Sequence, residues 1–130
     1  MNRQEAIEKI KEWALNLEAT DPQADGFAEA IEPLILPVVN ERLDFDTEKE
    51  TFTYKLKRPI AGEKSSIEVV EIHELSLEEK KVVQKYKDAE TVDQSEALLA
   101  KGCGIALGMA SKIGSRDQSV ISAVLTVFFS

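Results

Sequence analysis

The chain has 130 residues, of which 43% are hydrophobic and 31% charged, with a formal net charge of −8. This size and balance indicate one ordinary globular domain that can bury a core without disulfides. The acidic balance argues against nucleic-acid binding, because phosphate contacts require lysine and arginine. A single cysteine excludes an internal disulfide, and no apolar stretch approaches the roughly 20 residues of a membrane span. We therefore expect a cytoplasmic protein with neither a nucleic-acid nor a membrane partner.

The charge is unevenly distributed along the chain. Residues 1–50 hold 13 acidic and 5 basic side chains, whereas residues 51–130 hold 11 of each. Such a block is typical of a solvated helical face, the interpretation we favour, or of a segment that binds a partner. We expect a single domain over 1–130, in which 1–45 is an acidic helical segment.

The first 45 residues carry the pattern of two helices. Apolar residues three and four apart predict an amphipathic helix over 2–19, with Trp13 in the core. Asp21 before Pro22 predicts the N-cap of a second helix. Two further prolines in that helix predict a break or kink near Glu32, because proline supplies no backbone N–H.

A β-hairpin is predicted next, after an acidic connector over 44–50. Residues 52–57 alternate between apolar and polar, which is the pattern of a half-exposed strand. A turn around Gly62 leads to a second strand over 67–72. The apolar face changes at Val69–Val70, which suggests a β-bulge there.

The remainder of the chain predicts three capped helices. Ser76 begins an S-x-x-E capping box, and Asp93 and Ser115 begin similar patterns. The helix after Asp93 is expected to end at Gly114. Together with a hairpin near 51–73, these patterns predict an α+β fold that is predominantly α-helical, with about five helices.

Few residues carry catalytic potential. His73 is the one histidine, and no neighbouring motif gives it a nucleophile to activate. Cys103 lies between glycines and is expected to be a buried structural thiol. Asp44 and Asp46 resemble a calcium loop but lack its central glycine and spacing. We expect no enzyme, no catalytic residue, no cofactor and no metal, although the many carboxylates leave an acid-pair enzyme as an alternative.

Small residues recur in the predicted helix before Gly114. Ala100, Gly104 and Gly108 are four residues apart, which places them on one helical face. Each glycine costs roughly 1 kcal/mol of helix propensity relative to alanine. We therefore predict that this face packs closely against another helix, within the fold or between subunits.

The C-terminal segment, 118–130, contains no charged residue. Chain ends are usually polar and frayed, so an apolar end is expected to be covered by the core or by a partner. The core is the interpretation we favour, and the interface is the alternative. The apolar face that forms the candidate partner-binding site comprises Val120, Ile121, Val124, Leu125, Phe128 and Phe129.

Residues 51–130 also resemble a known family as a whole. The strand ending Leu56–Ile60 is followed by Gly62 and a returning strand to Leu75, and a helix then opens at Ser76-Leu77-Glu78. The run Ile113–Asp117 precedes the apolar last helix. This order resembles the tail assembly chaperones of long-tailed bacteriophages, with no counterpart for the first fifty residues in the shortest members.

The resemblance implies a protein that is not an enzyme and that acts in the host cytoplasm. Members of this family are mainly helical, self-associate, and bind the long tape measure protein while the tail tube polymerises. The major tail tube protein is a second candidate partner, and a homo-oligomer is expected. The alternative function is a small acidic bacterial adaptor or scaffold that binds a helical partner.

Overall fold

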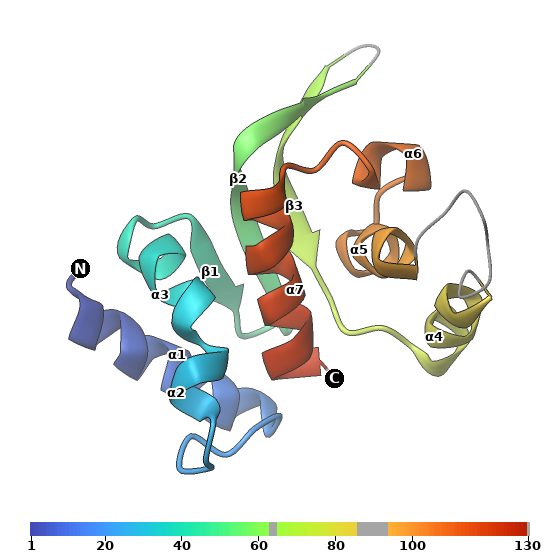
Figure 1. Cartoon of the computed structure of the whole chain (residues 1–130). Coiled ribbons are helices and arrows are strands. Elements are labelled where there is room, and N and C mark those ends of the chain that lie inside the picture. The colour runs from blue at the N-terminus through green and yellow to red at the C-terminus, as the bar shows by residue number, and fades with distance from the viewer. Residues whose placement is uncertain (63–64, 86–93, 130) are drawn as a thin grey trace.

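The computed structural model describes residues 1–62, 65–85 and 94–129. The elements are α1 (Arg3–Leu17), α2 (Phe27–Ala30), α3 (Glu32–Val39), β1 (Leu43–Asp46), β2 (Thr51–Ala61), β3 (Ser66–Ile72), α4 (Leu77–Gln84), α5 (Gln94–Cys103), α6 (Leu107–Ala110) and α7 (Ser115–Phe129). The strands form one antiparallel sheet in the order β1-β2-β3. Figure 1 shows α7 lying across the sheet, with α1 and α3 on one side of it and α4 to α6 on the other.

The expected α+β, helix-rich fold is confirmed. The five expected helices correspond to seven in the part of the chain that the structure describes, because two of them are interrupted. One break falls at Ile31, between α2 and α3, where the prolines predicted it. The other falls at Gly104, between α5 and α6, where we expected a continuous helix.

The first helix follows its sequence pattern closely. Asn2 accepts a hydrogen bond from the backbone N–H of Glu5, and the Glu5 side chain accepts one from Asn2, which completes a capping box. Trp13 is buried as expected, and its ring meets that of Phe52 edge-on, with 5.6 Å between centroids. The acidic N-terminal segment is therefore joined to the sheet through aromatic contacts.

The predicted helix start at Asp21 is wrong. The side chain of Asp21 accepts a hydrogen bond from the N–H of Gln23 at 2.9 Å, which closes a turn instead of capping a helix. The chain then passes through Gly26 at φ 87°, a conformation that favours glycine, and α2 begins at Phe27.

The strand β2 alternates as predicted, with Phe52, Tyr54 and Leu56 buried. The acidic connector at 44–50 is only partly a connector, because its first residues lie in β1. In β1 the apolar side chains are buried and the aspartates face solvent. The two aspartates made this short strand look like part of a polar connector in the sequence.

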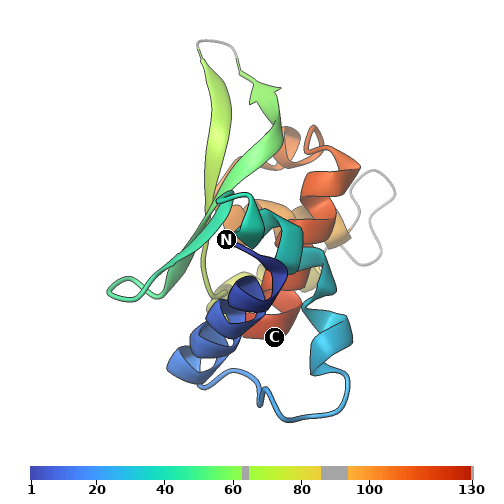
Figure 2. The same ribbon diagram turned by 90° about the vertical axis from the view of Figure 1, so that its left-hand side faces the viewer.

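The irregularity in the hairpin lies in β2 and not at Val69–Val70. Lys55 pairs with Val69 and Ile60 pairs with Ile67, so five residue steps on β2 face two on β3. The residues between Lys55 and Ile60 therefore leave the regular ladder. Beyond this point the hairpin projects upward in Figure 2. It remains in contact with the core, because Ile60 is buried and a Cβ at Gly62 would lie 3.7 Å from Cε of Met109 in α6.

The capping box at Ser76 is confirmed. Its hydroxyl accepts from the N–H of Glu79 at 3.1 Å, and α4 begins directly after it. Leu77, the first residue of this helix, is 72% exposed. The helix start predicted at Asp93 lies outside the described residues.

The core forms one cluster that contains residues from α1, α3, the three strands, α5 and α7. Its centre is aromatic: the rings of Phe52 and Phe128 are stacked with 4.6 Å between centroids. The acidic segment and the rest of the chain thus share a single interior. Among the helices that the structure describes, none has the length and apolar character needed to cross a lipid bilayer.

Candidate partner-binding groove

Part of the apolar face of α7 borders a surface opening. All six candidate partner-binding residues belong to the core cluster, because α7 packs against both the sheet and α3. Four of them do not line the opening: Val120, Ile121, Val124 and Phe128. The other two, Leu125 and Phe129, are also largely buried but line a hollow at the C-terminal end of the helix. The candidates for partner contact therefore narrow to Leu125 and Phe129.

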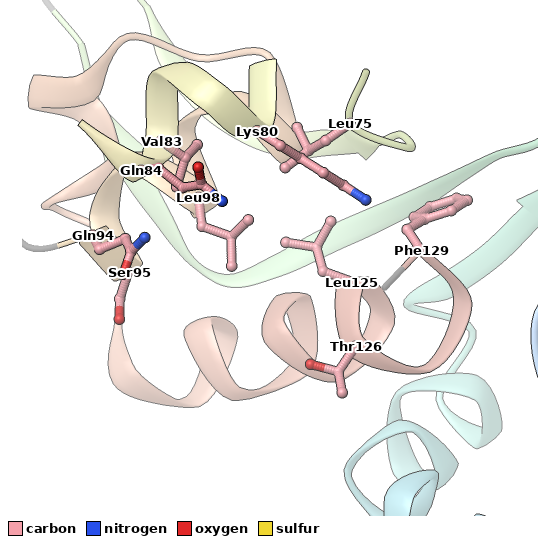
Figure 3. A pocket seen from close by; sticks show the side chains of 10 residues that line it. All are labelled: Leu75, Lys80, Val83, Gln84, Gln94, Ser95, Leu98, Leu125, Thr126 and Phe129. Atoms are coloured by element: carbon pink, nitrogen blue, oxygen red, sulfur yellow. The ribbon is translucent and has the colours of Figure 1, made fainter. Parts of the chain in front are cut away.

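This hollow, the apolar groove, lies between α4, α5 and the end of α7 and has a volume of about 430 Å³. Figure 3 shows Leu98 and Leu125 facing the same opening, with Lys80 extending across it toward Phe129. The full lining consists of Leu75, Lys80, Val83, Gln84, Gln94, Ser95, Leu98, Leu125, Thr126 and Phe129.

The groove separates α4 from the main core. Leu75, Val83 and Ala97 are buried, yet in the described part of the chain they lie outside the continuous core cluster. Leu98 is half-buried at the edge of that cluster. An opening between a small apolar cluster and the main core can accept apolar side chains with little rearrangement of the fold.

The groove combines an apolar wall with a polar rim. Its wall is built from aliphatic and aromatic side chains, and Lys80 is exposed and makes no ion pair with a described residue. A partner that inserts apolar side chains and places a carboxylate near Lys80 would match both features. The sequence pointed to Leu125 and Phe129 but not to α4 and α5, since their approach to α7 depends on tertiary packing.

The predicted small-residue face of Ala100, Gly104 and Gly108 is not continuous, because α5 ends before Gly104 and Gly108 lies in α6. Gly104 has φ 64° and ends α5, where the N–H of Ile105 donates to the carbonyl of Ala100 at 3.0 Å, as in a Schellman motif. A Cβ at Gly108 would meet nothing within 4 Å. The close approach occurs instead at Gly102, where a Cβ would lie 2.9 Å from Cδ2 of Leu125.

The candidate chemical groups have ordinary structural surroundings. His73 Nε2 lies 3.5 Å from Oε2 of Glu79, and the Ser76 backbone N–H and then His73 hold the pKa of Glu79 below its usual value. Burial raises the pKa of the Cys103 thiol to about 12. Asp46 accepts from two backbone N–H groups of its own turn. Among the described residues, no three His, Cys, Asp or Glu side chains gather as a metal site would require.

One important residue, Asp117, was expected only as part of a helix start. It is 1% exposed, and its carboxylate accepts from the hydroxyl of Tyr54 at 2.6 Å and from the backbone N–H groups of Lys57 and Arg58 at 2.9 and 3.0 Å. We call these groups the Asp117 network. Burial and the hydrogen bond to Asp117 raise the pKa of Tyr54 above its usual value. The network provides acceptors for N–H groups in the irregular part of β2.

Comparisons of this chain with family models, curated proteins and solved structures find no match. The apolar groove and the Asp117 network are therefore interpreted from their geometry and chemistry. The network is closed, since each carboxylate oxygen already has a donor. The groove is open, and it is the hollow whose lining suits the apolar side chains of a protein partner.

Proposed function

We propose that this chain is a non-enzymatic tail assembly chaperone of a long-tailed bacteriophage, which binds the tape measure protein through the apolar groove in the host cytoplasm. The observation that carries the proposal is the groove itself: about 430 Å³, lined by five apolar side chains on or beside helices and by one exposed lysine. The resemblance in sequence pattern between residues 51–130 and that family supports the choice of partner. The major tail tube protein is a second candidate partner, and self-association belongs to the same proposal.

A helical segment is the partner shape that suits this groove. Amphipathic helices insert side chains at i, i+3 or i+4 and i+7 into grooves between helices. A long helical protein that has not yet been enclosed by the tail tube would expose such side chains to water. Burying each one contributes roughly 1.5–3 kcal/mol, part of which offsets the cost of association. Two or three anchors thus give a reversible complex, as a chaperone requires.

The test is co-expression of the chain with the tape measure protein, followed by co-purification. Leu98→Asp places a charge in the groove at a half-buried position, and Leu36→Asp makes the same change on α3 at a side chain that is 67% exposed. We expect the native chain and Leu36→Asp to keep the long protein soluble and co-purify with it. We expect Leu98→Asp to lose at least nine-tenths of the co-purified protein while retaining native circular dichroism.

Two results would contradict the proposal. The tape measure protein could be equally soluble alone, or Leu98→Asp could co-purify as much of it as the native chain does. If the groove bound a generic amphipathic helix but not the tape measure protein, the acidic adaptor would be the better function. Light scattering over a concentration series tests self-association separately.

A further inference from the structure

A second hollow of about 440 Å³, the basic pocket, lies at the opposite end of α7. Four basic side chains line it: Arg42 from the residues before β1, Lys57 and Arg58 from the irregular part of β2, and Arg116 from the first turn of α7. Gly114, Ser115 and Asp117 complete the lining. The cations therefore come from three separate parts of the chain and converge on one place in a protein of net charge −8.

The charges of the pocket are only partly neutralised from within the described chain. The Lys and Arg ion pairs of the described residues all involve Arg3, Lys9 or Lys11, none of which lines the pocket. Asp117 is the one carboxylate in the lining, and its single negative charge faces four positive ones. Arg42 donates to two backbone carbonyls at 3.3 Å, which fixes its position but leaves its charge uncompensated.

Two of the cations are close to the start of α7. Arg116 is the second residue of α7, and the stem of Arg58 passes over Gly114, its Cδ being 3.6 Å from the position of a Cβ there. The acidic residue of this first turn, Asp117, is buried, whereas Arg58 and Arg116 are exposed. The two guanidinium groups are therefore accessible to a ligand.

We propose that the basic pocket binds an acidic segment of a partner protein through its carboxylates. Arginine suits this task because its planar guanidinium donates two parallel hydrogen bonds to one carboxylate. A nucleic acid fits less well, since nucleic-acid binding uses an extended basic stripe, whereas the four cations here converge on one hollow. The carboxylates of the ligand offset the positive charge that Asp117 alone does not balance.

This site is independent of the apolar groove. The two hollows share no lining residue and lie at opposite ends of a 15-residue helix. Variants of the basic pocket should therefore leave co-purification through the groove unchanged. A failure of one proposal does not imply a failure of the other.

The test compares two double variants that lose the same charge. Arg58→Gln with Arg116→Gln neutralises the pocket, and Lys81→Gln with Lys101→Gln removes two exposed cations elsewhere. The probe is a hexaglutamate peptide, titrated by calorimetry at low and at high salt. We expect the native chain and the lysine control to bind it with salt-sensitive affinity, and the arginine variant to bind at least tenfold more weakly.

Several results would overturn the proposal. The peptide could fail to bind the native chain, or the lysine control could lose as much affinity as the arginine variant. Tighter binding of a single-stranded oligonucleotide or of inorganic phosphate than of the peptide would assign the pocket to a different ligand. If the double variant does not fold, Arg116→Gln alone gives the same comparison.

Discussion

The two ends of α7 are held in different ways. At its N-terminal end, the buried carboxylate of Asp117 receives three hydrogen bonds from a strand about sixty residues earlier in the chain. At its C-terminal end, Phe128 and Phe129 contact Phe52 through their rings, and the helix borders the apolar groove. Hydrogen bonds to a charge fix one geometry, whereas apolar contacts tolerate adjustment. The helix is thus rigidly positioned at one end and adaptable at the other, where we place the partner.

The largest effect is expected at the apolar end. Phe128→Ala removes a ring that is stacked in the centre of the core, and such truncations cost about 3–5 kcal/mol because they leave a cavity. Urea denaturation measures the change in the free energy of unfolding. Leu36→Ala, at an exposed apolar position, is the control and should change it by less than about 0.5 kcal/mol. Equal effects would mean that the C-terminal end of α7 does not belong to the core.

The polar end should be nearly as sensitive. Asp117→Ala leaves three donors without their acceptor, and we expect a loss of about 2–4 kcal/mol in the free energy of unfolding. Tyr54→Phe removes only one of these hydrogen bonds and should cost about 1 kcal/mol. Both values come from urea titrations at neutral pH. If the two variants were equally stable, the backbone N–H groups of β2 would not depend on Asp117.

The glycines next to the groove provide a matched pair. Gly102→Ala forces Cβ against the buried side chain of Leu125, whereas Gly108→Ala enters open space. We expect Gly108→Ala to stabilise the chain by about 0.4–1 kcal/mol, and Gly102→Ala to be less favourable than this by about 1–3 kcal/mol. Thermal unfolding of both variants is sufficient to measure the difference. If Gly108→Ala were the less stable of the two variants, Gly108 would contact another helix, as the sequence predicted.

The smallest effect is a change in how stability depends on pH in the alkaline range. The pKa of Tyr54 is raised in the folded chain, so above pH of about 10 the unfolded chain loses this proton first. Fewer protons bound in the unfolded state means that stability falls as pH rises through this range. Tyr54→Phe should make the decline between about pH 9 and 11 shallower. The Cys103 thiol contributes a decline of the same sign in both proteins and does not affect the comparison.

Local patterns predicted the elements whose determinants lie close together in sequence. The capping box at Ser76, the alternation of β2 and the extent of α7 all depend on residues within one or two turns. Asp21 shows the limit of this method, because an aspartate before proline can cap a helix or close a turn.

The remaining features depend on partners distant in sequence. The sequence does not distinguish a glycine that ends a helix at positive φ from one that makes room for a neighbouring side chain. The close packing was therefore predicted at Gly104, which ends α5, although it occurs at Gly102. The role of Asp117 depends on a strand that approaches it only in the folded chain. The groove likewise forms only when α4 and α5 meet α7, and of its lining only Leu125 and Phe129 were predicted as contact residues.

The way Asp117 contacts β2 has a consequence for how this protein can change over time. The carboxylate receives the backbone N–H groups of residues 57 and 58, which every amino acid except proline possesses. The side chains at these positions are exposed and do not take part in the contact. Mutation can therefore alter the charge of Lys57 and Arg58 while the helix stays in place. Substitutions at these two positions can therefore change which partner the basic pocket binds without changing the fold.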